Sequence, residues 1–312
     1  MEANVFKREW TLCDMLVVMG PTASGKTAFA VKVARWINSL CSSGELPFKE
    51  CHIISADSRQ VYRGMDIGTG KDIAEYGEIT YHLIDIAEAG EKYDLFRYKK
   101  DFRKVYEKLK GENIFPILCG GSGLYIEAVC KDYDLKEVAP DPDLRAELEK
   151  KSMDELVAML SELKAKHGTT PHNNTDFDTK KRVIRAIEIE LAYDNIPARE
   201  DTGVHPEKVH YLALNPDRER RNQRIDRRLE ERLKAGMVDE VKALLDKGIK
   251  PEDLIYYGLE YKFLTQYITG EISYDYMKEH LAIAIHQFAK RQMTWLRGME
   301  RRGIKIEWIK TE

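Results

Sequence analysis

The chain has 312 residues, of which 33% are charged and 43% are hydrophobic, a composition typical of a globular protein with one large domain or two. Its 50 basic and 53 acidic side chains give a net charge of −3, so any nucleic-acid-binding surface has to come from local clusters of basic residues. The five cysteines form no C-x-x-C pair, the eight histidines lack metal-ligand spacing and no apolar run suits a signal peptide or membrane span, which excludes a disulfide framework, a zinc site and a membrane anchor and predicts a cytoplasmic location.

The first predicted strand, residues 15–19, leads into a phosphate-binding motif. Residues 20–27 read GPTASGKT, which fits G-x-x-x-x-G-K-[ST], and a predicted helix over 28–40 follows. In this context the loop turns backbone N–H groups around phosphate oxygens, Lys26 reaches the terminal phosphates and the Thr27 hydroxyl can bind Mg²⁺. The predicted phosphate-binding residues are Gly20, Pro21, Thr22, Ala23, Ser24, Gly25, Lys26 and Thr27.

A second cluster, DSRQVYRGMDIGTGK at residues 57–71, follows the second predicted strand, residues 52–56. In open α/β sheets ligands bind beyond the carboxyl ends of the strands, so Asp57 is expected on the same edge as the phosphate loop. There a carboxylate can bind Mg²⁺ through water or accept a proton from an attacking nucleophile. Asp57 can equally be a cap of the following turn.

A third glycine-rich turn, GGSGLY at residues 120–125, follows the strand predicted over 114–119, and a helix over 95–109 precedes that strand. Glycines at this edge allow a close approach of the backbone to a ligand. The alternation of strands and helices predicts a parallel sheet with crossover helices.

Between the third strand and a fourth, predicted over 209–214, the pattern becomes helical and polar. Residues 131–205 are interpreted as a helical insertion in the α/β core, with surface helices of a single domain as the alternative. The core would then comprise residues 1–130 and 206–312, the latter with long helices over 218–234 and 274–297.

Basic residues cluster on these predicted helices. Arg182 and Arg185 share one helix face, as do Arg224 and Arg228, and Lys290 begins KRQMTW. Such runs are either solvated helix faces or, beside a phosphate loop, a clamp for pyrophosphate or an RNA backbone.

Together, these segments resemble the tRNA dimethylallyltransferase (tRNA isopentenyltransferase) family. The matching motifs run in family order and cover almost the whole chain: GPTASGKT at 20–27, DSRQVYRGMDIGTGK at 57–71, HLID at 82–85, GGSGLY at 120–125, RVIRAIE at 182–188, RIDRR at 224–228, YITGEIS at 267–273 and AKRQMTWLR at 289–297.

The resemblance implies a P-loop NTPase-like core with a parallel sheet, flanking helices and an inserted helical domain that binds tRNA. It implies transfer of a dimethylallyl group from its diphosphate to N6 of adenosine 37 in the tRNA anticodon loop. The loop at 20–27 would hold the diphosphate, although such loops are normally ATP-binding and the sequence leaves open whether ATP also enters. Lys26 and Arg228 would neutralise the leaving group, aided by Thr22 and by Mg²⁺ on Thr27, and Asp57 would accept the N6 proton.

The resemblance also implies a path for the anticodon stem-loop, whose target base has to leave its stack. The residues expected on that path are Asp57, Ser58, Arg59, Gln60, Ser122, Arg145, Lys181, Arg182, Arg185, Gln287, Lys290 and Arg291. A monomer suffices for this activity. The chain lacks the C-terminal zinc finger of the eukaryotic enzymes, so a bacterial type is expected.

Four positions depart from the family pattern. Ser122 stands where the family usually has Thr, and Tyr81 replaces the first member of a His-His pair. Arg232 stands where the family commonly has Met, and Glu260 replaces the Gly of a Gly-Tyr-[KR] motif expected near the tRNA.

Three other functions remain open. An adenylate isopentenyltransferase would share the core and act on free AMP or ATP, but it has no need of the basic segments 179–185 and 286–293. A P-loop small-molecule kinase would share Lys26 and Thr27 without the later motifs. An RNA-binding module without catalysis would not need a grip on pyrophosphate.

Overall fold

The computed structural model describes residues 6–133, 135, 138–168, 177–193 and 202–311. The chain divides into two compact units. The core unit comprises Met1–Tyr133 and Thr202–Glu312, and the insertion unit comprises Asp134–Asp201. The chain therefore leaves the core unit once, after its fourth strand, and returns before the fifth.

A parallel sheet organises the core unit. Its strands are β1 (Met15–Met19), β2 (Cys51–Ser55), β3 (Tyr81–His82), β4 (Phe115–Gly120), β5 (Val209–Pro216) and β6 (Ile306–Thr311). They lie in the order β3-β2-β4-β1-β5-β6, and all their pairings are parallel. The predicted parallel sheet with flanking helices is confirmed, and the strand before the phosphate loop lies in its interior.

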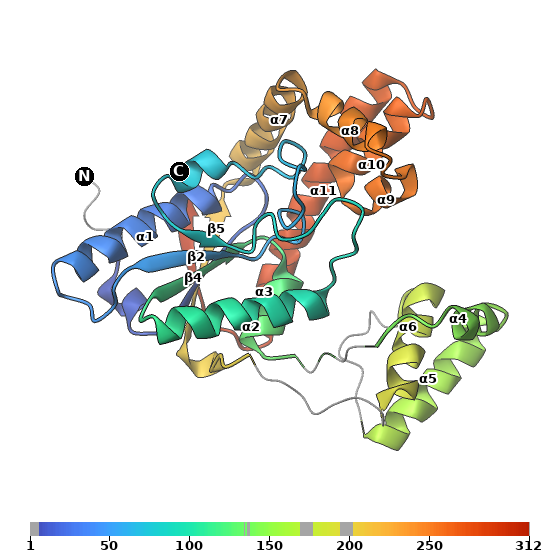
Figure 1. Cartoon of the computed structure of the whole chain (residues 1–312), viewed down its shortest axis with the longest axis horizontal. Helices are drawn as coiled ribbons and strands as arrows, with labels where there is room; N and C mark the ends of the chain where they lie inside the picture. Colours follow the sequence, from blue (N-terminus) through green and yellow to red (C-terminus); the bar gives the residue numbers. More distant parts are fainter. Residues whose placement is uncertain (1–5, 134, 136–137, 169–176, 194–201, 312) are drawn as a thin grey trace. The chain divides into compact units, whose positions relative to one another are not determined.

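Helices cover both faces of this sheet. The helices of the core unit are α1 (Lys26–Ser42), α2 (Leu95–Gly111), α3 (Gly123–Cys130), α7 (Arg218–Lys234), α8 (Met237–Asp246), α9 (Pro251–Tyr256), α10 (Leu259–Ile268) and α11 (Tyr274–Arg301), with short 3₁₀ turns at Arg8–Thr11, Ile73–Tyr76 and Pro206–Lys208. Figure 1 shows α1 and α2 on opposite sides of the strands. Among the described helices, none combines the length and apolar character needed to cross a membrane.

The alternation of side chains along each strand produces two buried clusters. Met15, Val17 and Met19 pack on the side of α2, α3 and α11, whereas Leu16 and Val18 pack on the side of α1. Every residue of β1 is fully buried. A parallel sheet covered on both faces requires such continuous apolar strands.

Glu240 of α8 fixes the segment that follows β2. Its carboxylate accepts hydrogen bonds from the backbone N–H groups of Asp66 (2.7 Å), Ile67 (2.7 Å) and Gly68 (3.0 Å). It also accepts one from the hydroxyl of Tyr261 on α10, at 2.6 Å. The Tyr261 ring lies directly over Gly68, where a Cβ atom would approach it to 2.8 Å. One side chain thus ties the loop after β2 to two helices.

A buried lysine holds the same segment from its other side. The Lys71 side chain is 1% exposed and its ammonium contacts Asp66 at 2.8 Å. It also contacts the Asp85 carboxylate and the Tyr62 carbonyl oxygen. Because a buried ammonium needs all of its donors satisfied, Lys71 fixes how residues 62–85 fold back on themselves.

The insertion unit is a small helical assembly with its own core. Helices α4 (Pro142–Glu149), α5 (Met153–His167) and α6 (Lys180–Leu191) bury side chains that include Leu156, Leu160 and Ile187. Arg145 and Arg185 both pair with the Glu188 carboxylate, at 2.7 and 3.1 Å, and that side chain is only 1% exposed. These two arginines therefore stabilise the unit.

Replacing Glu240 by alanine tests how the loop after β2 is held. Glu240→Ala leaves three backbone N–H groups without their acceptor, and we expect the free energy of unfolding to fall by roughly 1–3 kcal/mol. Urea denaturation measures the change, with Glu279→Ala on the exposed face of α11 as the matched control. Equal stabilities of the two variants would contradict this role for Glu240.

Candidate active site

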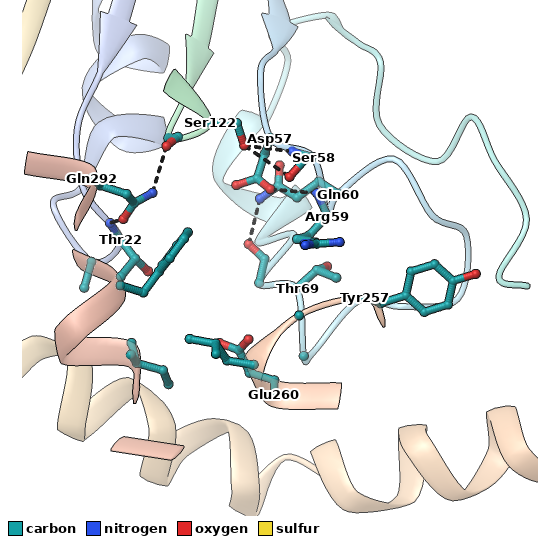
Figure 2. Close-up of a pocket in the computed structure, with 18 of the residues that line it drawn as sticks. Thr22, Asp57, Ser58, Arg59, Gln60, Thr69, Ser122, Tyr257, Glu260 and Gln292 are labelled. Atoms are coloured by element: carbon teal, nitrogen blue, oxygen red, sulfur yellow. Dashed lines mark hydrogen bonds between the residues drawn. The ribbon is translucent and has the colours of Figure 1, made fainter. Parts of the chain in front are cut away.

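A cavity of ≈ 650 Å³ lies in the core unit where β1, β2 and β4 end. Each of these strands delivers one predicted loop to it: residues 20–27, 57–71 and 120–125. Side chains from α7, α10 and α11 complete the wall. The sequence predicted that all three loops lie on the carboxyl edge of the sheet. Figure 2 shows residues from each of the three loops around the cavity.

The phosphate loop presents the start of α1 to this cavity. Gly25 has φ of 80°, a conformation that glycine adopts without strain, and α1 begins at Lys26. Thr22, Lys26 and Thr27 line the cavity. Unpaired N–H groups of the first helical turn and the positive end of the helix dipole favour an anion at this position.

Two side chains from distant helices organise the loop. Arg228 of α7 donates from Nη2 to Thr22 Oγ1 at 2.5 Å. Gln292 of α11 accepts the Thr22 N–H at 2.8 Å and donates from Nε2 to the Gly121 carbonyl oxygen at 2.9 Å. Gln292, which falls in a segment predicted to contact RNA, thus bridges the first and third loops (Figure 2).

Asp57 caps the turn after β2 and also lines the cavity. Its Oδ1 accepts the Arg59 N–H at 2.9 Å, which is a cap of the turn after β2. The residue also lines the cavity, together with Ser58, Arg59 and Gln60. Ser122 Oγ accepts the Ser58 N–H at 3.0 Å and so joins the second and third loops. The hydroxyl retained at this family departure therefore has a partner.

The glycines of the third loop make room for the protein's own side chains. A Cβ atom on Gly123 would lie 2.2 Å from the Trp295 ring, and one on Gly121 would lie 2.6 Å from Gln292 Nε2. The sequence predicted a close approach of this backbone to a ligand. In the structure the close approach is made by α11, which carries both side chains.

Positive charge is concentrated in this cavity. Lys26, Arg228 and Arg232 all line it. Burial lowers the pKa of Lys26 and lowers that of Arg228 to about 10, and Arg232 shifts both in the same direction. Burial raises the pKa of Glu260, which lines the same wall from α10. Three half-buried cations with mutual repulsion make an anion the complementary ligand.

The rim of the cavity is aromatic and basic. Tyr256 and Phe288 are 50% and 41% exposed, although both are large apolar residues. The guanidinium of Arg59 lies 5.9 Å from the centre of the Tyr256 ring, and that of Arg291 lies 5.9 Å from the Phe288 ring. The sequence analysis missed Tyr256 and Phe288, because nothing in their spacing separates an exposed aromatic residue from a core one.

The residues predicted to contact RNA fall into three groups. Ser58, Arg59, Gln60, Ser122 and Arg291 line the cavity along with Asp57. Gln287 and Lys290 are exposed on α11. Arg145, Lys181, Arg182 and Arg185 belong to the insertion unit, where Lys181 and Arg182 are exposed and the other two pair with Glu188.

The remaining family departures are Tyr81, Arg232 and Glu260. Tyr81 packs against Tyr76, with ring centres 4.7 Å apart. His82 Nε2 lies 3.0 Å from His52 Nδ1, so a histidine pair forms across β2 and β3. Burial lowers the pKa of His82 to about 4, which keeps its ring neutral at pH 7. Glu260 and Arg232 both face the cavity that holds Lys26.

Comparison with known proteins identifies the family. The family model described as IPP transferase matches residues 60–299. The chain is 52% identical to tRNA dimethylallyltransferase 1 of Parabacteroides distasonis and 51% identical to tRNA dimethylallyltransferase 2 of Bacteroides fragilis, in each case over 95% of this chain and 92% of the relative.

Solved structures agree with this assignment. The crystal structure of the tRNA isopentenylpyrophosphate transferase from Bacillus halodurans aligns with a TM-score of 0.65 and 29% identity, over 95% of this chain and 89% of that one. A eukaryotic dimethylallyltransferase acting on tRNA shares the fold at a TM-score of 0.70 and 21% identity, over 94% of this chain and 73% of its own. This chain belongs to the IPP transferase family.

Proposed function

We propose that this protein transfers the dimethylallyl group of dimethylallyl diphosphate to N6 of adenosine 37 in the anticodon loop of tRNA. One observation carries the proposal: a single cavity contains a strongly cationic end, at Lys26 and Arg228, and a carboxylate, Asp57, on the neighbouring loop. The reaction needs both, since a diphosphate leaves as an amine nitrogen is alkylated and loses a proton. The names of the relatives support the same reaction.

The cationic end would bind the donor. Lys26, Arg228 and the first N–H groups of α1 would hold the diphosphate oxygens, and Thr22 would add its hydroxyl. As the bond between the allylic carbon and the diphosphate oxygen breaks, negative charge grows on the leaving group. Fixed cations in a partly buried site stabilise that charge without reorganising.

A magnesium ion fits beside this loop if the donor supplies most of its ligands. Within the described residues, no group of three or more His, Cys, Asp or Glu side chains is arranged to hold a metal. Thr27 lines the cavity and would contribute its hydroxyl oxygen. Mg²⁺ commonly binds through one or two protein oxygens, substrate phosphates and water. When bound, it would neutralise charge on the diphosphate.

Asp57 would act on the acceptor. Its Oδ1 is oriented by the Arg59 N–H, which leaves Oδ2 available to accept the proton of the N6 amine. The adenine has to leave the anticodon stack to enter a cavity of this kind. Tyr256 and Phe288 at the rim offer surfaces on which bases can stack, and Arg59 and Arg291 offer charge for the backbone.

An adenylate isopentenyltransferase is the second candidate, because the cavity alone would serve free AMP as well. The exposed aromatic-basic rim and the basic residues Lys181 and Arg182 of the insertion unit favour RNA. A mononucleotide needs neither surface.

The proposed enzyme acts in the cytoplasm as a monomer.

The acceptor is tested directly by supplying both candidates. Purified protein with Mg²⁺ and dimethylallyl diphosphate is incubated with an anticodon stem-loop carrying A36-A37-A38 or with AMP. We expect mass spectrometry to find one added C5 unit on the stem-loop and none on AMP. Modification of AMP alone would establish the second candidate, and the absence of both products would refute prenyl transfer.

Replacing Asp57 by asparagine separates its two roles. The Asn side chain keeps an oxygen that can accept the Arg59 N–H but removes the proton acceptor. We expect the single-turnover rate to fall by roughly 10²- to 10⁴-fold, with stem-loop affinity nearly unchanged in a filter-binding assay. Asp57→Ala, which also removes the cap, serves as the comparison. A rate for Asp57→Asn close to wild type would show that Asp57 is a cap and not a base.

A further inference from the structure

Arg232 belongs to the cationic wall but has no strong partner there. It lies one helical turn after Arg228 on α7, and its side chain is 12% exposed. Its Nη2 atom is buried and makes no hydrogen bond, and Asp72 Oδ2 lies 3.7 Å from it. A buried guanidinium donor without an acceptor is costly, and the part of the Arg232 side chain that lines the cavity is open to an anionic ligand.

The loop after β2 is shaped to hold this guanidinium. A Cβ atom on Gly70 would lie 1.8 Å from Arg232 Nη2, and Gly70 has φ of +65°. A side chain at this position would displace Arg232 from the wall. The glycine thus leaves room for the guanidinium against the loop, and Arg232 lines the cavity that also contains Lys26 and Thr22.

Glu260 supplies the opposite charge from the first turn of α10. It lines the same cavity. Burial raises the pKa of Glu260, and the nearby Arg232 and Arg228 offset part of that rise. Within the described part of the chain, no salt bridge joins its carboxylate to either arginine. The acid therefore offsets the field of the cations while leaving their hydrogen-bond donors available.

The two residues carry opposite charges, and both line the same cavity. Their charges cancel in sum, but their positions differ. Arg232 lies beside Arg228 on α7, and Glu260 lies on α10.

We propose that Arg232 is a further diphosphate-binding residue and that Glu260 is its counter-charge, which competes with the bound diphosphate and speeds its release. This inference rests on the proposed function for the identity of the anion. Before the donor binds, Glu260 lowers the repulsion among Lys26, Arg228 and Arg232. After transfer, its carboxylate opposes the negative product and favours departure.

Binding measurements with wild type and three variants test the pair. Isothermal titration with Mg²⁺ gives the dissociation constants of dimethylallyl diphosphate and inorganic diphosphate for wild type, Arg232→Met, Glu260→Gln and Arg232→Met/Glu260→Gly. We expect Arg232→Met to raise the dissociation constants of both ligands roughly 10- to 100-fold, because a hydrogen bond from a charged group is lost. Glu260→Gln should tighten the binding of inorganic diphosphate several-fold, and the double variant should bind it more tightly than Arg232→Met but more weakly than wild type.

Arg227→Met on the exposed face of α7, where the side chain is 73% exposed, is the matched control. It removes the same charge outside the cavity and should leave both constants unchanged. Arg232→Lys, which keeps a cation, should recover part of the lost affinity. Thermal unfolding of each variant shows whether a weak binder is still folded.

Kinetics separate the two halves of the pair. In Glu260→Gln the steady-state turnover should fall relative to the single-turnover rate because diphosphate leaves more slowly. Folded Arg232→Met that binds both ligands like wild type would overturn the role of Arg232. Weaker diphosphate binding by Glu260→Gln would overturn the counter-charge. Binding is read without an acceptor, so a wild-type protein that binds the donor but modifies no stem-loop would refute the proposed function and not the pair.

Discussion

Three cations line one cavity of the core unit, and the fold has to hold them close together against their mutual repulsion. Lys26 comes from the loop after β1, whereas Arg228 and Arg232 come from α7, more than two hundred residues later. Direct pairing is sparse: Arg228 donates to Thr22, and Arg232 lies 3.7 Å from Asp72. Holding such groups together requires a rigid frame. The buried parallel sheet and the hydrogen bonds of Glu240 and Gln292 provide it.

The same repulsion explains why the loops of the site are held by residues that lie far from them in the sequence. Gln292 bridges the first and third loops, and Ser122 joins the third loop to the second. Glycines at 121 and 123 admit α11 side chains where any Cβ atom would collide with them. The helices after β5 therefore do more than cover the sheet, because they fix the loops that carry the proposed diphosphate site and Asp57.

The parts predicted from sequence are those with a local signal. Buried strands appear in the sequence as apolar runs, and the phosphate loop has a fixed pattern. The sequence therefore predicts β1, β2, β4 and β5, and it predicts that the site lies at the carboxyl edge of the sheet. The two-residue β3 and the edge strand β6 carry too little pattern to be recognised. Gln292, Tyr256 and Phe288 depend on packing between distant segments. The sequence also does not show which basic residues form ion pairs, so the pairing of Arg145 and Arg185 with Glu188 was not predicted.

A structure with an unreactive thio analogue of dimethylallyl diphosphate and an anticodon stem-loop would test the account most directly. The account predicts diphosphate oxygens in contact with Lys26, Thr22 and Arg228, and a flipped adenine whose N6 lies between the allylic carbon and Asp57. Diphosphate bound away from the loop at 20–27, or a base that enters the cavity with N6 turned away from Asp57, would contradict it.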